Sequence, residues 1–350
     1  KCGTNSANWS SCSRTSTPAG VRLRRFQVGF LNLPGMDKPV QPLDVVYTGL
    51  YAQDDWRVTD NLKVIAGVRV DAPFFKQTGY TNVNADGLTF RDENGNDVQY
   101  KSGELPGAKP HWSPRVGFNW DVTGDRRTQV RGGTGVFTGP PAYVWISNQV
   151  GNTGMLTGEV TIDTTTTRPF HPDPDHYKPT ERNGNPARSY ALAITDPDFK
   201  FPQVWRTNVG VDRQLPLGLV ATADFVYNRD VNGIYYINAN LPAAQSQFSG
   251  PDQRPRWTSN RINNATGNQV STNVVMKNQN VGNGYNVAFS LERPFSSGLF
   301  LKGAYSYGIM KNTVDPGSIA SGTWQNNPHA GDPNNPGTGI SINSPGHRVF

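Results

Sequence analysis

The chain of 350 residues has no long run of apolar residues, and its mean hydropathy is −0.57. A membrane-spanning helix needs about 20 consecutive apolar residues, so this kind of membrane segment is excluded. Membrane-spanning β-strands are not excluded, because such a strand shows apolar side chains only at every second position and its hydropathy averages out. The sequence also has no convincing amphipathic helix. Its 37 glycines and 27 prolines favour turns and loops.

The chain is poor in cysteine, with only Cys2 and Cys12. Two cysteines cannot form a four-ligand zinc centre. They lie close together in a segment rich in Ser, Thr and Asn, and this spacing predicts a small disulfide loop in an oxidising compartment, the alternative being two unrelated thiols. No signal peptide follows Lys1. Because an exported protein needs one, we expect this N-terminus to be either mature or truncated.

Clusters of basic residues are absent, although the net charge is +6 and the isoelectric point is about 9.3. A nucleic-acid surface would need Lys and Arg gathered in one region, whereas here they are scattered. We therefore expect no nucleic-acid partner. The excess positive charge is better explained by solvated loops and by arginines on the inner face of a barrel.

Catalytic and nucleotide-binding motifs are also missing: there is no G-x-S-x-G, H-E-x-x-H, P-loop or dinucleotide fingerprint. We predict a protein that is not an enzyme and needs no cofactor. Residues 92–97 begin like a calcium loop but lack its sixth-position Gly and twelfth-position Glu, which favours a polar loop tip. Weak candidates for a metal site are His171, Asp173, Asp175 and His176, where prolines favour an extended, exposed loop instead.

What the sequence does have is strict alternation of apolar and polar residues. The clearest stretch runs from Trp112 to Val122, with one fully apolar face and an opposite face that carries Arg115 and Asp121. Successive side chains of a strand point to opposite faces. A soluble sandwich would bury the apolar face in a core, whereas a membrane barrel turns it to lipid and keeps the polar face in the lumen.

The alternating stretches come in pairs that are joined by short turns, and the pairs are separated by long connections. Several such loops are rare in soluble domains, but short turns at one rim and long loops at the other are typical of transmembrane barrels. We expect the short turns at the periplasmic rim. The predicted strands are residues 46–56, 62–72, 112–122, 128–137, 203–214, 218–228, 284–293 and 298–308, and the long loops are residues 77–110, 139–201, 229–282 and 310–346.

The phase of the alternation assigns side chains to the two faces. A charged Arg or Lys side chain on the lipid face at mid-depth would cost about 2–4 kcal/mol, so the charged residues are predicted to face the lumen. These lumen candidates are Arg69, Asp71, Arg115, Asp121, Arg131, Arg206, Asp212, Asp224, Glu292 and Lys302. The candidates for lipid contact or for the aromatic girdles are Trp56, Val68, Trp112, Val116, Phe118, Trp120, Phe289 and Leu291.

Three blocks resemble TonB-dependent outer-membrane receptors. Residues 49–56 (GLYAQDDW) are similar to a strand–turn–strand block of that family, and residues 113–118 (SPRVGF) to the next hairpin in its Oar-like branch. Residues 202–227 resemble the hairpin after that. Together the blocks cover most of residues 47–307.

The resemblance implies a barrel of about 22 strands, an N-terminal plug and a segment that contacts the energy-transducing partner TonB. Its function would be energy-coupled uptake of a nutrient or complexed substrate through the plugged barrel. The partners implied are outer-membrane lipid, the TonB complex through an N-terminal segment that is missing here, and an unknown small-molecule or peptide substrate.

We therefore predict an all-β fold, an antiparallel transmembrane β-barrel with long extracellular loops, of which this chain holds about nine or ten strands. Residues 1–45 would form a loop or short β segment with Cys2 and Cys12, and residues 46–350 part of the barrel. The predicted location is the bacterial outer membrane. The alternative is a secreted or cell-surface all-β binding or adhesion protein whose apolar faces meet in a soluble core.

Overall fold

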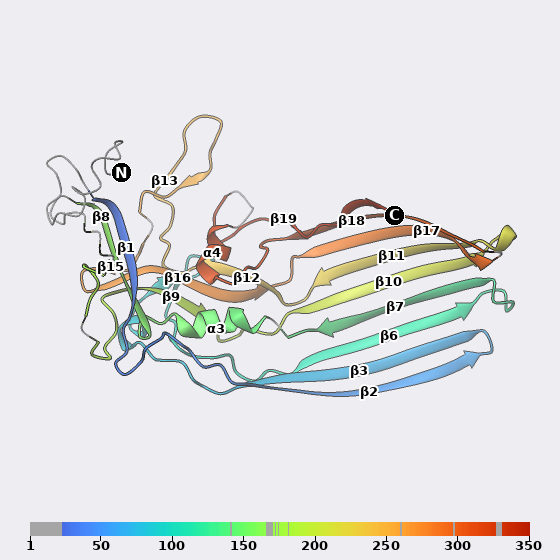
Figure 1. Cartoon of the computed structure of the whole chain (residues 1–350), viewed down its shortest axis with the longest axis horizontal. Coiled ribbons are helices and arrows are strands. Elements are labelled where there is room, and N and C mark those ends of the chain that lie inside the picture. The colour runs from blue at the N-terminus through green and yellow to red at the C-terminus, as the bar shows by residue number, and fades with distance from the viewer. Residues whose placement is uncertain are drawn as a thin grey trace.

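One long antiparallel sheet extends along much of the molecule, and a second layer lies at one end of it (Figure 1). The structure is a computed structural model that describes residues 23–350, except residues 141, 166–170, 172, 174, 181, 260, 297 and 327–330. The predicted disulfide between Cys2 and Cys12 lies outside the described residues. No helix in the described part of the chain is long and apolar enough to cross a membrane.

The main sheet has ten strands, and four hairpins with short turns supply its eight long strands. All four turns lie at the same end, away from the second layer (Figure 1). At one of them, the 3₁₀ turn η2 (Pro216–Gly218), the chain reverses through positive φ angles at Leu217 and Gly218. The strands are β2 (Val45–Thr59), β3 (Leu62–Phe75), β6 (His111–Asp121), β7 (Thr128–Thr138), β10 (Gln203–Gln214), β11 (Val220–Asp230), β17 (Asn283–Ser296), β18 (Leu299–Asn312), β19 (Gly339–Ile340) and β20 (Gly346–Val349).

The order along the sheet is β19-β18-β17-β11-β10-β7-β6-β3-β2, with β20 also paired to β18. Every neighbouring pair is antiparallel, and the sheet is open, with β2 at one edge. The regular register explains why the alternation in the sequence is so clean: each residue keeps its face across all the long strands.

The long connections fold into a layer of their own, which we call the outer layer. Its central sheet contains β9 (Ser189–Thr195), β12 (Gly233–Asn238), β15 (Asn264–Ala265) and β16 (Asn268–Gln279), with β9 parallel to β16. A separate ribbon pairs β1 (Leu23–Leu31) with β8 (Thr157–Thr165). The remaining elements are two small hairpins, β4 (Phe90–Arg91) with β5 (Asp97–Val98) and β13 (Ser246–Gln247) with β14 (Pro255–Arg256), and the helices α2 (Val83–Asp86), α3 (Tyr143–Gly151) and α4 (Ala320–Gln325).

The sequence predicts these connections only as long loops, whereas in the structure they contain strands and helices. The reason is physical. The strand β16 has four consecutive buried residues, Asn273–Met276, and β12 is nearly as buried. A strand covered on both faces has no polar side to alternate with, so it gives no period-two signal.

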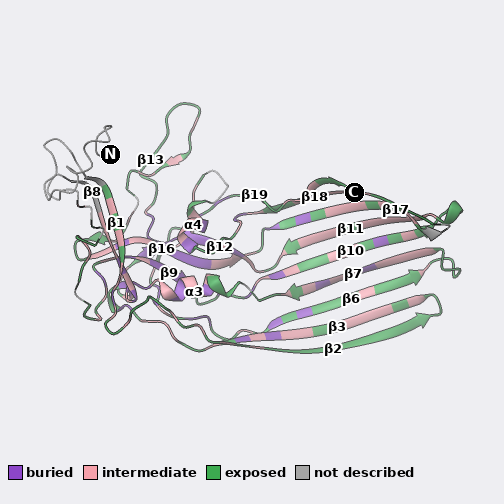
Figure 2. Ribbon diagram, in the orientation of Figure 1, coloured by how far each residue is buried: buried purple, intermediate pink, exposed green. Residues whose placement is uncertain are grey.

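The hydrophobic core lies in the outer layer and not against the apolar face of the main sheet (Figure 2). Ile146, Ile237 and Val274 are completely buried there. By contrast, Val68 is 39% exposed and Phe289 is 54% exposed on the apolar face of the main sheet. An apolar face this exposed does not form the soluble core that the alternative interpretation requires.

Candidate functional site: a charged sheet face beneath a packed outer layer

Cross-strand pairing divides the main sheet into two chemically distinct faces. Directly opposed residues of an antiparallel pair share a face. Val116 is opposite Ala66 and Thr134, whereas Arg115 is opposite Gly67 and Gly135. Following the register across all the long strands places the eight lipid or girdle candidates on one face, here called the apolar face, and the ten lumen candidates on the other, the polar face.

A three-strand ion network lies at the centre of the polar face. Nε of Arg131 is 3.0 Å from Oδ2 of Asp212, and its Nη2 is 3.0 Å from Oδ1 of Asp224. The hydroxyl of Thr222 donates to the other oxygen of Asp212 at 2.8 Å. The residues come from β7, β10 and β11, so the network ties three strands together through side chains as well as through the backbone.

A second pair lies nearer the outer layer. The Arg69 guanidinium donates to both oxygens of Asp71, at 2.7 to 2.9 Å. The side chain of Asp71 is only 1% exposed, while that of Arg69 is 42% exposed. The carboxylate is thus covered, and the paired guanidinium presents its remaining surface to the space above the sheet.

Two further arginines on this face have neutral partners. Nη2 of Arg115 donates to Gln53 at 3.0 Å, and Nε of Arg206 donates to Asn228 at 2.7 Å. Neither guanidinium has a carboxylate within ion-pair distance among the described residues. The polar face therefore keeps uncompensated positive charge beside its ion pairs.

The remaining lumen candidates lie nearer the short turns. Lys302 and Glu292 pair across β18 and β17 at 3.0 Å. The Asp121 carboxylate accepts backbone N–H groups of Gly124 and Arg126, at 3.1 and 2.9 Å, and so stabilises the β6–β7 turn. The structure brings Arg131, Asp212 and Asp224 into contact but leaves Lys302 and Asp121 in separate local contacts.

The outer layer contains a cavity of about 790 Å³ between the β1–β8 ribbon and residues 177–189. Its wall combines the aromatic rings of Phe30 and Tyr177 with polar groups that include Glu159, Arg188 and Gln269. A largely preformed hollow with a few converging polar side chains is the usual form of a ligand site. No sequence pattern predicts this cavity, because its residues come from segments far apart in the chain.

The weak metal candidates lie next to this region. The imidazole rings of His171 and His176 stack with their centroids 3.7 Å apart, and His176 contacts the Tyr177 ring edge-on at 4.6 Å. Asp175 is 3.2 Å from the ammonium of Lys178, and Asp173 accepts a backbone N–H. Across the described residues, no group of three or more His, Cys, Asp or Glu side chains is arranged to hold a metal ion.

The calcium-like segment forms the tip of the β4–β5 hairpin. One oxygen of the Asp92 carboxylate accepts the backbone N–H groups of Asn94 and Asn96, at 2.9 and 2.8 Å, and the other accepts the Asn96 amide. These hydrogen bonds hold the pKa of Asp92 below its usual value against the opposing effect of partial burial. The carboxylate therefore stabilises a turn.

A half-buried charge cluster connects parts of the outer layer. The ammonium of Lys277 is 2.8 Å from Glu93 and 3.5 Å from Asp196, and the hydroxyl of Tyr235 donates to Glu93 at 2.9 Å. Burial, followed by the neighbouring Glu93 carboxylate, raises the pKa of Tyr235. Because the members come from three different connections, the cluster fixes those connections relative to one another.

The outer layer is joined to the main sheet by aromatic packing. Phe201, which is 1% exposed, stacks on Tyr47 with ring centroids 6.0 Å apart and meets Phe75 edge-on at 6.0 Å. Its backbone N–H donates to Nε2 of His111 at 2.8 Å. Tyr47, Phe75 and His111 belong to β2, β3 and β6, so one residue of the outer layer contacts three strands at the rim.

Comparison with known families identifies the class of protein. A family described as an outer membrane β-barrel domain matches residues 7–344. The chain therefore belongs to this family, and it is a protein of the bacterial outer membrane. The predicted fold, part of an antiparallel transmembrane barrel, is confirmed. No curated protein sequence matches the chain.

Several solved structures share part of this arrangement at low identity. The FrpB iron transporter from Neisseria meningitidis is 10% identical, with a TM-score of 0.41 over 81% of this chain and 29% of that one. The siderophore receptor PirA from Pseudomonas aeruginosa is 11% identical, with a TM-score of 0.39 over 76% and 34%. The outer membrane transporter YddB from Escherichia coli is 11% identical, with a TM-score of 0.37 over 78% and 34%. The chain thus spans about a third of the length of these proteins.

Proposed function

We propose that this chain is a central part of the barrel of a TonB-dependent receptor, which takes up a nutrient or complexed substrate across the outer membrane. In this proposal the apolar face contacts lipid, the polar face lines the lumen beside a plug, and the short turns lie in the periplasm. The protein acts by binding and passage and catalyses no reaction. The resemblance of residues 49–56 and 113–118 to receptor hairpins supports the assignment.

The observation that carries the proposal is that one chain combines a sheet with a charged face and a separately packed outer layer. The main sheet offers a charged inner wall, with the Arg131 network and the uncompensated Arg115 and Arg206. The outer layer above it is a packed unit with its own core and a cavity of about 790 Å³. A receptor needs these two parts: an outer surface that selects a ligand and a lined route beneath it.

The ligand would first meet the outer layer. The cavity beside the β1–β8 ribbon offers aromatic rings for packing and the guanidinium of Arg188 for an acceptor group on the ligand. Arginines of the polar face could then bind acceptor groups along the route, because guanidinium groups without carboxylate partners keep their donors available.

Cross-linking in living cells tests the energy coupling. Cells that express the full-length protein are treated with formaldehyde, and outer-membrane extracts are probed for an adduct with TonB. We expect an adduct that disappears in a strain without TonB. An outer-membrane protein that gives no adduct, in cells where an established receptor gives one, would contradict the proposal and leave a barrel of another class.

A further inference from the structure

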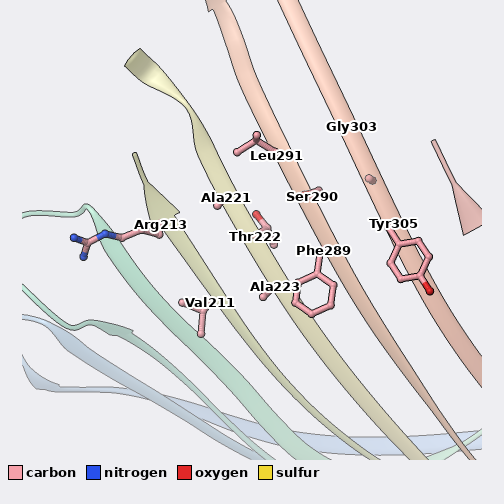
Figure 3. A pocket seen from close by; sticks show the side chains of 11 residues that line it. Val211, Arg213, Ala221, Thr222, Ala223, Phe289, Ser290, Leu291, Gly303 and Tyr305 are labelled. Atoms are coloured by element: carbon pink, nitrogen blue, oxygen red, sulfur yellow. The ribbon is translucent and has the colours of Figure 1, made fainter. Parts of the chain in front are cut away.

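The apolar face carries an open groove of about 620 Å³ near the short turns (Figure 3). Its floor is formed by Ala221 and Ala223 of β11, which are small side chains on a face otherwise rich in large ones. In the register, Ala221 lies between Arg213 and Leu291, on β10 and β17. Because Ala221 and Ala223 follow one another on the same face of β11, the floor of the groove runs along this strand.

The next rung forms the rest of the walls. Ala223 lies between Val211 and Phe289, and Phe289 is directly opposite Tyr305 of β18. Phe289 is 54% exposed and Tyr305 is 41% exposed, so their rings stand clear of the sheet on one side of the floor. A flexible apolar chain that lies on the alanines would contact these rings along its length.

Two arginines lie near the end of the groove that is closest to the turns, Arg213 in its wall and Arg293 just beyond it. Arg213 lies three residues before the turn η2, and its guanidinium donates to the hydroxyl of Thr128. Arg293 is opposite Leu301 and follows Leu291 by two residues, which places it on the same apolar face and one rung closer to the turns. Neither arginine has a carboxylate within ion-pair distance among the residues that the structure describes.

The position of these charges indicates the ligand. On the lipid side of a barrel, an Arg is strongly unfavourable at mid-depth and close to neutral near the interface. At the interface, the natural partner of a guanidinium is a phosphate group, which it binds through charge-assisted hydrogen bonds. An apolar groove with two guanidinium groups near its interfacial end, neither of them paired with a carboxylate among the described residues, thus matches an acyl chain joined to an anionic headgroup.

We propose that this groove binds one acyl chain of an anionic glycerophospholipid of the periplasmic leaflet, with the lipid phosphate between Arg213 and Arg293. The inference rests on the proposed orientation, in which the apolar face contacts lipid and the short turns are periplasmic. The lipid would act as a fixed ligand of the sheet at β10, β11 and β17, in contrast to the exchanging lipids around it.

Native mass spectrometry of the full-length protein, extracted in mild detergent, tests the proposal. The protein is titrated separately with dioleoyl phosphatidylglycerol, with dioleoyl phosphatidylethanolamine and with lipopolysaccharide. Arg213→Gln combined with Arg293→Gln should weaken phosphatidylglycerol binding about tenfold or more and change phosphatidylethanolamine binding much less. Ala223→Phe should fill the floor and weaken both phospholipids alike.

Two control variants match these changes. Arg126→Gln combined with Arg127→Gln removes two positive charges from the β6–β7 turn at the same rim, and Ala66→Phe enlarges an alanine of the apolar face outside the groove. Both should bind phosphatidylglycerol like the unaltered protein. Equal losses in the test and control variants, or preferential retention of lipopolysaccharide, would overturn the proposal.

The outcome is independent of energy coupling. A protein that fails to cross-link to TonB would still show the lipid readout, and a protein that loses the lipid would still form the TonB adduct.

Discussion

At the scale of single residues, glycine decides how an arginine can lie on the polar face. A Cβ atom at position 210 would come within 3.0 Å of Cζ of Arg131 and closer still to the Asp224 carboxylate. The guanidinium and the carboxylate can therefore meet only because β10 has no side chain at that point. Glycine at this position of the polar face thus leaves room for charged side chains from the neighbouring strands to lie across the sheet.

Gly210→Ala should break the contact between Arg131 and Asp224 and lower the free energy of unfolding by about 1–2 kcal/mol. The estimate joins a modest loss from a partly exposed ion pair with the strain of an added methyl group. Thermal unfolding in detergent, followed by circular dichroism, measures the change. Gly303→Ala is the control, because nothing lies within 4 Å of a Cβ there. Equal effects of the two variants would show that the network does not depend on the glycine.

Buried tyrosines make the outer layer sensitive to alkaline pH. Burial raises the pKa of Tyr190 from 10.0 to about 12, and its hydroxyl donates to Asn268 at 2.6 Å. Because the folded state holds the proton more tightly than the unfolded state, this contribution to stability is complete below pH 10. It is lost as the pH rises towards 12, by about 2–3 kcal/mol in all.

Tyr190→Phe should therefore flatten the loss of stability between pH 10 and 12, although the variant is less stable at pH 7 because it lacks the hydrogen bond. Denaturant unfolding of the outer layer at each pH, followed by tryptophan fluorescence, measures this. Tyr143→Phe, at a tyrosine that is 37% exposed, should leave the pH curve unchanged. A curve for Tyr190→Phe as steep as that of the unaltered protein would show that burial of this residue does not control the transition.

At the scale of secondary-structure elements, Phe201 is the main link between the outer layer and the sheet. Phe201→Ala should remove the contacts with Tyr47 and Phe75 and lower the stability of this junction by about 3–5 kcal/mol. Limited proteolysis should then release fragments of the outer layer faster, while the main sheet stays intact. Phe137→Ala, which truncates a ring that is 44% exposed, is the matched control. Equal digestion of the two variants would contradict the assigned role of Phe201.

The elements also differ in how well the sequence predicted them. The hairpin of β6 and β7 is predictable from the sequence, because one face of each strand is apolar and the other polar, and the alternation from Trp112 to Val122 is unbroken. The outer layer is not predictable in this way. Its strand β12 is buried nearly throughout and therefore shows no apolar–polar alternation. Its strand β9 pairs in parallel with β16, which is distant in the sequence, so no local pattern predicts this pairing.

The candidate site was predictable to a similar extent. Alternation predicts Arg131, Asp212 and Asp224 on one face, but only the side-chain distances in the structure show that they meet. The outer cavity and the groove over Ala221 and Ala223 depend on how separate strands and connections pack. Such features have no signature in a single stretch of sequence.

The connections between the elements predict a sided pattern of cleavage. The β13–β14 hairpin projects from the outer layer (Figure 1), and residues 243–251 are exposed along it. Proteinase K added to intact cells should cut there first and spare the short turn at residues 122–127. After the outer membrane is opened, the turn should be cut as well. Early cleavage at the turn in intact cells would reverse the proposed orientation.

At the scale of the whole molecule, the sheet is suited to lipid on one side and to a polar interior on the other. Its edge strand β2 is exposed almost throughout, and the sheet order does not close on itself among the described strands. Unpaired strand edges are not tolerated in hydrocarbon. We therefore expect further strands to pair with β2 in the membrane, so that the sheet forms part of a larger barrel.

The central claim is that the apolar face of the main sheet contacts lipid and the polar face lines the lumen. A cysteine scan of residues 112–122 tests this claim most directly. In a protein whose native cysteines are replaced by serine, each position is changed to cysteine and labelled with a fluorophore in lipid vesicles. Quenching by brominated lipid should be strong for Val116→Cys and Phe118→Cys and weak for Arg115→Cys and Gly117→Cys, with the opposite order for aqueous iodide. Protection of Val116→Cys and Phe118→Cys from both quenchers would mean that the apolar face packs in a protein core, and it would contradict the account.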